Sequence, residues 1–561
     1  MEEPILQTVG QGALAAVMLA SVATLAILSP VLLTLFRRAS KRGMLTIAGV
    51  RKDPPPVPSV APPKGRLEVR RIGEADDFSA HEEAASQFQR MKGRLRSAVG
   101  VYALAGVGYA VIFAVAWSLL VGGGFVASRF LILLLYFTWP LLLTVGIVGT
   151  ASRSERWRLR VGLLGTFLVV MLILSTTENP SFRPTLLLWF LINGPATLAF
   201  LLTQHRPIRS FGLLVLALTL FAFAGALLAF VWLQSQPSAL EGYAAFVFQL
   251  GLSAEAALGL ALGVGFVALG ILAWPTWRLI GAVYRAKWVS TQMLHLDALW
   301  LTFALFHGVL LLPSGWQWGA VGLLAFVVYW GVTRLGFALL SRTSSPAPRL
   351  LLLRVFALGS RSEGLFDQFT KGWLRLGSIQ MIAGPDLLSK TIEPQEFMQF
   401  VSGRHGERFV TSHEEVERGL QAIDLSPDAD GRYRTTEFFC HHDTWEPMMQ
   451  GLAKESEVVL MDLRRFGPDN EGCRYELKQL LSFVPLQRVL LVLDLSTDDA
   501  FLESLLMELW ATIPEDSPNY ADPNPTLSAL VIERQDRKTI HRLLELLTEA
   551  SIATKTSPIS G

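Results

Sequence analysis

The hydrophobic and polar positions divide the chain into two parts. Up to about residue 340, apolar stretches of roughly 15 to 25 residues alternate with short polar loops. A helix needs about 20 apolar residues to cross the hydrocarbon core of a bilayer, so such stretches predict membrane-spanning helices. We therefore expect a multi-pass transmembrane region at 1–340. Its nine predicted spans are 12–36, 99–121, 130–149, 161–175, 185–202, 211–233, 256–280, 294–312 and 320–340.

The pattern changes after residue 350. Short continuous apolar runs alternate there with amphipathic helices, and the runs are "LLLLRVFAL", "SIQMIA", "EVVLMDL", "RVLLVLD" and "TLSALVIE". Continuous apolar strands indicate a parallel sheet that helices cover on both faces. We predict a linker at 341–349 and a doubly wound, flavodoxin-like α/β domain with five parallel strands at 350–561. An insert at about 391–456 contains a helix, a turn at "PDADG" and the strand-like segment "RYRTTEFFC".

Composition and charge support this division and give an orientation. The chain of 561 residues is 51% hydrophobic and only 17% charged, whereas soluble proteins are about a quarter charged. Basic residues gather in alternate loops, at 37–97, 150–160, 204–210 and 284–292, and after residue 341. Because basic loops stay on the cytoplasmic side, we expect a plasma membrane protein, of the bacterial inner membrane type. Its N-terminus would lie outside and its C-terminal domain in the cytoplasm.

The loop at 37–97 is long enough to hold structure of its own. It contains the proline-rich spacer "DPPPVPSVAPP" and then the segment "DDFSAHEEAASQFQRMKGRLRS". The second segment predicts an amphipathic helix that continues into the second span. Its basic end would rest on anionic lipid or pack on the cytosolic domain, and the sequence leaves both open.

Few ionisable residues lie inside predicted spans, where such groups are functional candidates, and we single out Asp297, His307 and Arg334. Asp297 and Arg334 lie near the cytoplasmic ends of their spans, so we expect them to pair with each other or to reach the headgroups. For His307 we expect a hydrogen bond to a neighbouring helix. The chain shows no two-half repeat of the kind that marks secondary transporters.

Polar residues follow several predicted strands, at the edge where doubly wound sheets bind ligands. Helix N-termini at this edge offer free N–H groups to phosphate or carboxylate, and arginines would add positive charge. Tight turns are the alternative explanation for each glycine and aspartate taken singly. The candidate ligand-binding residues are Gly359, Ser360, Arg361, Gly384, Asp386, Asp462, Arg464, Arg465 and Asp494.

The remaining composition argues against metal sites and nucleic acid. The two cysteines, Cys440 and Cys473, cannot form a disulfide framework and favour a reducing compartment. "CHHD" at 440–443 lacks the second ligand pair that metal sites use, so we predict no metal. Asp443 and Glu446 have instead the spacing of a helix capping box. No dense basic run with interleaved aromatic residues occurs, so we predict no nucleic-acid partner.

Two short motifs resemble those of TIR domains. "RVFALGSRSE" is similar to the first strand and loop of that fold, and "GCRYEL" at 472–477 is similar to the "WCxxEL" signature on its third helix, with Gly472 at the tryptophan position. The resemblance implies a TIR-like domain in which Glu476 is the catalytic residue for NAD cleavage. A carboxylate can stabilise the positive ribose that forms in this reaction. The alternatives are a solvated or ion-paired helix residue with Arg474 or Lys478 as neighbours, and a residue for non-catalytic ligand binding or assembly.

These observations lead to an expected function with two alternatives. We expect an integral membrane sensor or signalling effector whose cytosolic TIR-like domain binds or cleaves a nucleotide such as NAD. Besides the lipid bilayer, we expect self-association or a protein partner through the cytosolic domain. The first alternative is a non-enzymatic, membrane-anchored assembly module. The second is a transporter or channel with a regulatory cytosolic domain.

Overall fold

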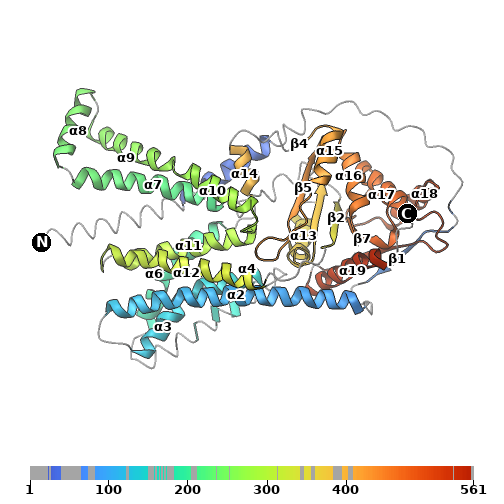
Figure 1. Ribbon diagram of the computed structural model, residues 1–561, viewed down its shortest axis with the longest axis horizontal. Coiled ribbons are helices and arrows are strands. Elements are labelled where there is room, and N and C mark those ends of the chain that lie inside the picture. The colour runs from blue at the N-terminus through green and yellow to red at the C-terminus, as the bar shows by residue number, and fades with distance from the viewer. Residues whose placement is uncertain are drawn as a thin grey trace.

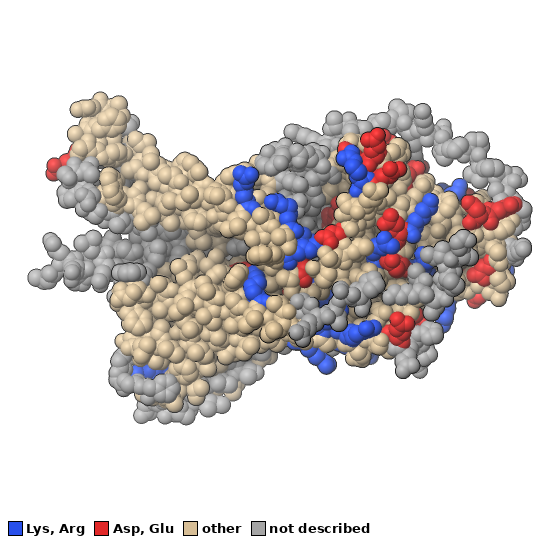
Figure 2. All heavy atoms as spheres, in the orientation of Figure 1, with Lys and Arg blue, Asp and Glu red and all other residues tan. Residues whose placement is uncertain are grey.

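The structure is a computed structural model with a helical region and an α/β domain (Figure 1). It describes a few isolated positions (63 and several between 157 and 172) and the segments 23–24, 27–39, 65–73, 82–121, 126–149, 182–203, 212–235, 237–251, 253–311, 314–340, 347–354, 360–382, 394–401, 409–441, 443–534 and 536–556. On the face seen in Figure 2, charged side chains gather on the α/β domain and at its junction with the helical region. The helical region presents an almost uncharged surface there.

The helical region consists of apolar helices, as the sequence predicts. Five stretches of the described residues are long and apolar enough to cross a membrane, at Glu83–Leu120, Ala127–Val148, Gly259–Arg285, Thr291–Leu311 and Gln317–Leu340. The helices are α2 (Glu82–Val121), α3 (Ala127–Phe137), α4 (Trp139–Val148), α6 (Phe182–Thr203), α7 (Gly212–Ser235), α8 (Pro237–Gln249), α9 (Ala254–Gly270), α10 (Ala273–Arg285), α11 (Thr291–Leu311) and α12 (Trp316–Leu340). The predicted span 161–175 lies mostly outside the described residues, and 12–36 lies partly outside them.

The α/β domain contains one parallel sheet of eight strands, in the order β1-β8-β7-β6-β2-β3-β5-β4. The prediction of five strands is therefore wrong in number, because β1, β4 and β5 extend the sheet at its two edges. The strands are β1 (Glu68–Ile72), β2 (Arg349–Arg354), β3 (Ser378–Ile382), β4 (Phe409–Val410), β5 (Thr435–Cys440), β6 (Val458–Asp462), β7 (Val489–Asp494) and β8 (Thr526–Ile532).

The five predicted strands are nevertheless doubly wound. Numbered along the chain, β2, β3, β6, β7 and β8 lie in the order 2-1-3-4-5, so the winding direction reverses between β2 and β6. One face of the sheet carries α15 to α18 and the other carries α13, α19 and the first half of α2. The helices of the domain are α13 (Ser360–Trp373), α14 (Pro394–Val401), α15 (His413–Gln421), α16 (Trp445–Glu455), α17 (Glu471–Phe483), α18 (Asp499–Trp510) and α19 (Arg537–Thr556).

Strand β1 comes from the loop that precedes α2, far from the rest of the sheet in sequence. It pairs with β8 over five residues. Leu67 and Ile72 are buried in the cores on opposite faces of the sheet, and the Trp510 indole N–H donates to the Gly65 carbonyl oxygen at 2.9 Å. The α/β domain is thus built from two separate parts of the chain.

Helix α2 connects the domain directly to the helical region. It is continuous over 40 residues, which is about 60 Å at 1.5 Å per residue. In its first half, Phe88 and Met91 are buried against the sheet domain, and the Phe88 ring contacts His541 of α19 edge to face. In its second half, Tyr109 and Phe113 belong to the core of the helical bundle. Of the two environments left open by the sequence, the start of α2 therefore packs on the α/β domain.

Side-chain pairs within the bundle agree with the sequence analysis. Arg334 donates to the Asp297 carboxylate at 2.6 Å, and the His307 Nδ1 atom lies 2.9 Å from the Tyr109 hydroxyl of α2. The expected capping box at Asp443 is wrong, because α16 begins at Trp445 after the N-cap residue Thr444. The Thr444 hydroxyl donates to the Val410 carbonyl oxygen at 2.6 Å instead, which ties α16 to β4.

Candidate functional site

The reversal between β2 and β6 is the point where this fold type binds ligands. Arg354, the last residue of β2, pairs in register with Asp462, the last residue of β6, and both are buried. Paired residues of parallel strands point to the same face. The alternation along β2 and β6 places both side chains on the face of α13. Two oppositely charged side chains therefore lie beside each other at the carboxyl edge of the sheet.

The loop after β6 adds two arginines to this edge. Arg464 is buried and donates to both Asp462 carboxylate oxygens, at 2.8 Å from Nε and 2.6 Å from Nη2. Arg465 is exposed and has a φ of 60°, in the left-handed region. A non-glycine residue in this region costs free energy and is typical of functional loops. The turn holds the Arg465 side chain at the surface beside a buried Asp462–Arg464 pair.

Glu476 lies one and a half turns into α17. Its side chain is 3% exposed, on the helix face that also carries Cys473, Leu477 and Leu480. Its Oε2 atom has no hydrogen-bond partner, and burial raises the pKa of the carboxyl group to about 8. Glu476 is therefore mostly protonated at neutral pH. Helix α17 covers the face of the sheet opposite to α13.

The Cys473 thiol is affected by the charges of both Glu476 and Asp462, the last residue of β6. Burial raises the pKa of the Cys473 thiol, and the carboxylates of Glu476 and Asp462 raise it further. The thiol stays protonated at neutral pH, so it is not an activated nucleophile.

Of the other predicted site residues, the structure describes Ser360, Arg361 and Asp494. The Asp494 carboxylate accepts from the Ser496 amide and hydroxyl groups, so it stabilises the turn before α18, as the tight-turn alternative predicts. Ser360 and Arg361 form the start of α13. Gly359, Gly384 and Asp386 lie outside the described residues. The structure therefore brings together Asp462, Arg464 and Arg465 among the predicted residues.

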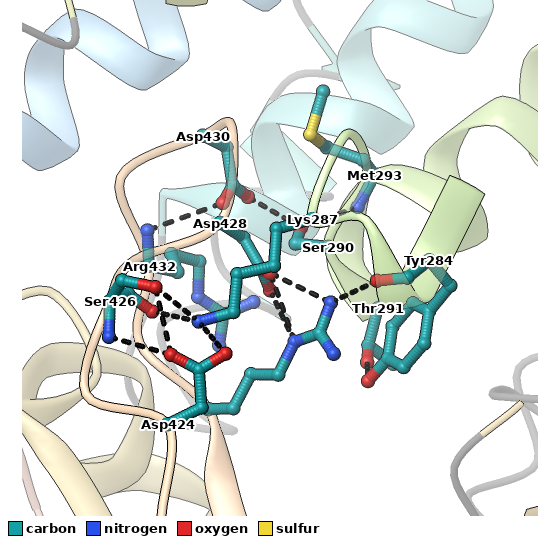
Figure 3. A network of polar contacts seen from close by, with 11 residues as sticks. Tyr284, Lys287, Ser290, Thr291, Met293, Asp424, Ser426, Asp428, Asp430 and Arg432 are labelled. Atoms are coloured by element: carbon teal, nitrogen blue, oxygen red, sulfur yellow. Dashed lines mark hydrogen bonds and ion pairs between the residues drawn. The ribbon is translucent and has the colours of Figure 1, made fainter. Parts of the chain in front are cut away.

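A second polar assembly joins the turn between α10 and α11 to the loop 424–434 before β5 (Figure 3). We call it the junction network. Its members are Tyr284, Lys287, Ser290, Gln292, Asp424, Ser426, Asp428, Asp430, Arg432 and Arg434. The Lys287 ammonium group contacts the Asp424 carboxylate at 2.7 Å and also donates to Ser426. Lys287 has a φ of 61°, so its backbone is also left-handed.

Arg434 is the most connected cation of the junction network. It donates to the Asp428 carboxylate at 2.8 to 3.1 Å and to the Tyr284 carbonyl oxygen at 2.6 Å, and its guanidinium group lies 3.9 Å from the centre of the Tyr284 ring. Burial raises the pKa of Asp428 to about 6. The carboxylate is therefore ionised at neutral pH and is neutralised by Arg434.

We expect Arg434→Met to loosen the junction network. The substitution keeps the apolar stem but leaves the buried Asp428 carboxylate without its cation, which costs about 3–5 kcal/mol. Amide hydrogen exchange at 424–434 and 284–291 should accelerate. Arg418→Met is the matched control, because the ion pair that Arg418 makes within the described residues is an exposed contact of 3.9 Å with Glu415, worth less than about 1 kcal/mol. Equal exchange in the two variants would contradict this role of Arg434.

Sequence reasoning missed Arg354 and the junction network. The signal for Arg354 was present, since an arginine ends the apolar run "LLLLR" at the carboxyl edge of a predicted strand. The loop "DLSPDADGRYR" was interpreted as a turn, although its three aspartates and two arginines are more charge than a turn requires. Its partners lie in the α10–α11 turn, about 140 residues earlier, so spacing alone could not reveal them.

Comparisons of the chain with protein-family models, with curated proteins and with solved structures give no match.

Proposed function

We propose that the protein is a membrane-embedded sensor or signalling effector whose α/β domain binds a nucleotide such as NAD at the reversal between β2 and β6. The observation that carries this proposal is the set of charged residues at that point. Arg354 and the Asp462–Arg464 pair are buried at the strand ends, and Arg465 is exposed beside them in a strained turn. Arginines in this position suit the phosphates of a nucleotide.

The firm connection between the two regions supports a signalling role. Helix α2 is shared by the cores of both regions, and the junction network adds charged contacts. Helix α14 packs on α10, where Phe397 meets Trp277 edge to face. We propose that the helical region spans the plasma membrane with the α/β domain in the cytoplasm. A change in one region would then be transmitted to the other through these contacts.

We propose binding, in preference to cleavage, as the main activity of the site. The TIR resemblance assigns NAD cleavage to Glu476, which would have to be ionised and close to the ribose. Glu476 is buried and mostly protonated at neutral pH, and it belongs to α17, on the sheet face opposite to Arg354 and Asp462. A neutral carboxyl group stabilises a developing positive charge poorly, so these features favour a ligand that is held and not turned over.

The test uses the full-length protein in lipid nanodiscs. Wild-type protein should bind NAD in a calorimetric titration, and Arg465→Gly should bind it at least about tenfold more weakly, since a charge-assisted hydrogen bond contributes about 1.5–3 kcal/mol. Glycine accepts the left-handed backbone, so this variant should fold normally. Arg474→Ala, an exposed arginine on α17, is the control and should bind like wild type.

Two outcomes would overturn this proposal. One is the absence of NAD binding by the wild-type protein, and the other is equal affinity in wild type and Arg465→Gly. Nicotinamide release is measured in the same samples. If wild type releases nicotinamide and Glu476→Gln does not, the protein is an NAD-cleaving enzyme and the preference for binding is wrong.

A further inference from the structure

Buried polar atoms without a hydrogen-bond partner gather where α2, α11 and α12 meet the α/β domain. Buried polar groups are almost always satisfied in proteins, so such a group of atoms needs an explanation. We call the residues that carry them the junction site. Within the described residues these atoms are the Tyr102 and Tyr329 hydroxyls, Gln292 Nε2, Arg334 Nη1, Arg375 Nε, Arg432 Nε and Asp297 Oδ1.

The loops that carry Arg375 and Arg432 lie side by side, because the Tyr433 amide donates to the Leu374 carbonyl oxygen at 2.7 Å, and long-range electrostatic interactions link them to the helices. Tyr102 interacts with Arg375 and Asp430 on the domain side and with Asp297 and Arg334 in the bundle. Tyr329 interacts with Tyr102, Asp297 and Arg334. The Tyr102 hydroxyl is therefore within electrostatic range of charged groups from both regions.

The domain side of the junction site is held by direct hydrogen bonds. Arg432 donates to the Gln292 side-chain oxygen at 2.7 Å, and the Ser290 hydroxyl donates to Asp430 at 2.6 Å. Arg94 of α2 donates to the Arg375 carbonyl oxygen at 2.8 Å. These bonds fix the backbone around the site while Arg375 Nε, Arg432 Nε and the tyrosine hydroxyls stay unsatisfied.

The junction site has an excess of donors and of positive charge. Of its seven unpartnered atoms, six can donate a hydrogen bond and Asp297 Oδ1 can only accept. Asp297 is paired with Arg334, whereas Arg375 and Arg432 have no carboxylate partner among the ion pairs of the described residues. Arg375 is 3% exposed, and burial lowers its pKa to about 10, with Arg432 lowering it further and the Asp430 carboxylate opposing this shift. The Asp430 carboxylate offsets only one of the two arginine charges, so water could satisfy the donors, but only a further anion would also compensate the remaining charge.

We infer that the junction site binds a phosphate-bearing anion, held by the guanidinium groups of Arg375 and Arg432 and by the hydroxyl groups of Tyr102 and Tyr329. The same chemistry fits the headgroup of an anionic lipid and a free phosphate. The site lies where the apolar parts of α2, α11 and α12 meet the α/β domain, and headgroups of an enclosing bilayer would be found at this level.

This anion site is separate from the proposed nucleotide site. Arg375 and Arg432 lie in the loops that enter β3 and β5, so they belong to the amino edge of the sheet. The nucleotide proposal concerns the opposite, carboxyl edge. The two proposals can therefore fail or succeed independently. An anion bound at the junction site would stabilise the docked arrangement of the helical region and the domain.

The test compares thermal stability of the full-length protein with two probes. In the lipid arm, nanodiscs of phosphatidylcholine are compared with nanodiscs that also contain phosphatidylglycerol. In the soluble arm, inorganic phosphate is titrated in detergent against sodium chloride of equal ionic strength. Wild-type protein should melt at a higher temperature with at least one of the probes, because the anion binds only the folded state.

The deciding variant is Tyr102→Phe, which removes only an unpartnered hydroxyl. It should be at least as stable as wild type without the anion, yet need about tenfold more phosphate or phosphatidylglycerol for the same rise in melting temperature. Arg375→Gln should abolish the rise. Tyr109→Phe is the matched control, because its hydroxyl on the same helix already contacts His307, and its response should equal that of wild type.

The outcomes distinguish a lipid headgroup, a soluble anion and water as the occupant of the junction site. A response to phosphatidylglycerol that Tyr102→Phe weakens assigns a lipid headgroup, and a response to inorganic phosphate that Tyr102→Phe weakens assigns a soluble anion. If wild type responds to neither probe, or if Tyr102→Phe responds as strongly as wild type, the site holds water and the inference is wrong.

Discussion

Residues 350–561 produced without residues 65–96 will not form a stable soluble domain. The fragment lacks β1, which covers the edge of β8 over five residues, and it lacks Leu67, Ile72, Phe88 and Met91, which are all buried. At about 1.5–3 kcal/mol for each side chain, the loss is roughly 6–12 kcal/mol, comparable with the whole stability of a typical domain. We expect aggregation, since an uncovered strand edge also recruits other chains. Solubility and cooperative thermal unfolding measure the effect.

Fusing residues 65–96 to the fragment through a flexible linker should restore a soluble, cooperatively unfolding domain. The control carries the same fusion with Leu67→Asp and Ile72→Asp, which keeps the length but removes the side chains that enter the two cores. It should behave like the fragment alone. A fragment 350–561 that is as soluble and cooperative as the intact fusion would show that β1 is dispensable.

Glu476→Gln should remove a large pH dependence of stability. The unfolded carboxyl group ionises near pH 4.3, whereas burial raises the folded pKa to about 8. Between these values the folded state binds the extra proton, so the free energy of unfolding falls by about 1.4 kcal/mol for each pH unit. The loss is roughly 4 kcal/mol from pH 5 to pH 8. It is absent below the unfolded pKa and complete above the folded pKa.

Thermal unfolding of the full-length protein at pH 5, 6, 7 and 8 measures this effect. Wild type should lose stability relative to Glu476→Gln across the series, and the variant should be the more stable protein at pH 8. Glu508→Gln is the control, because Glu508 is exposed on the neighbouring α18 and should follow wild type. Parallel curves for wild type and Glu476→Gln would mean that this carboxyl group is hydrated in the folded state.

Local patterns predicted most of the fold because its central strands are continuous apolar runs. "EVVLMDL" and "RVLLVLD" became β6 and β7, the buried centre of the sheet. Strand β1 has the sequence "EVRRI", and its charged residues obscure the hydrophobic pattern of a strand. As an edge strand it pairs with only one neighbour. Its partners are Thr526–Leu530, more than 450 residues later in the chain, and no local preference encodes such a partner. Strand β4 is two residues long, too short for any periodic signal.

The candidate site was predictable only in part, for a similar reason. Asp462 and Arg464 follow an apolar run, so their place at the carboxyl edge could be deduced from the sequence. The burial of Glu476 could also have been deduced, since it lies three residues after Cys473 and four before Leu480 on one helix face. The junction site could not, because Tyr102, Arg375 and Arg432 come together only through the docking of two regions.

The origin of β1 also has a consequence for synthesis on the ribosome. Its partner strand is translated about 450 residues later, which takes roughly 20 to 90 seconds at ordinary elongation rates. During this time the nascent Glu68–Ile72 segment has been synthesised but its partner strand β8 has not. The α/β domain can close only when its last strand emerges, so β1 finds its partner late in translation, and a ribosome that stalls before β8 leaves the sheet unfinished.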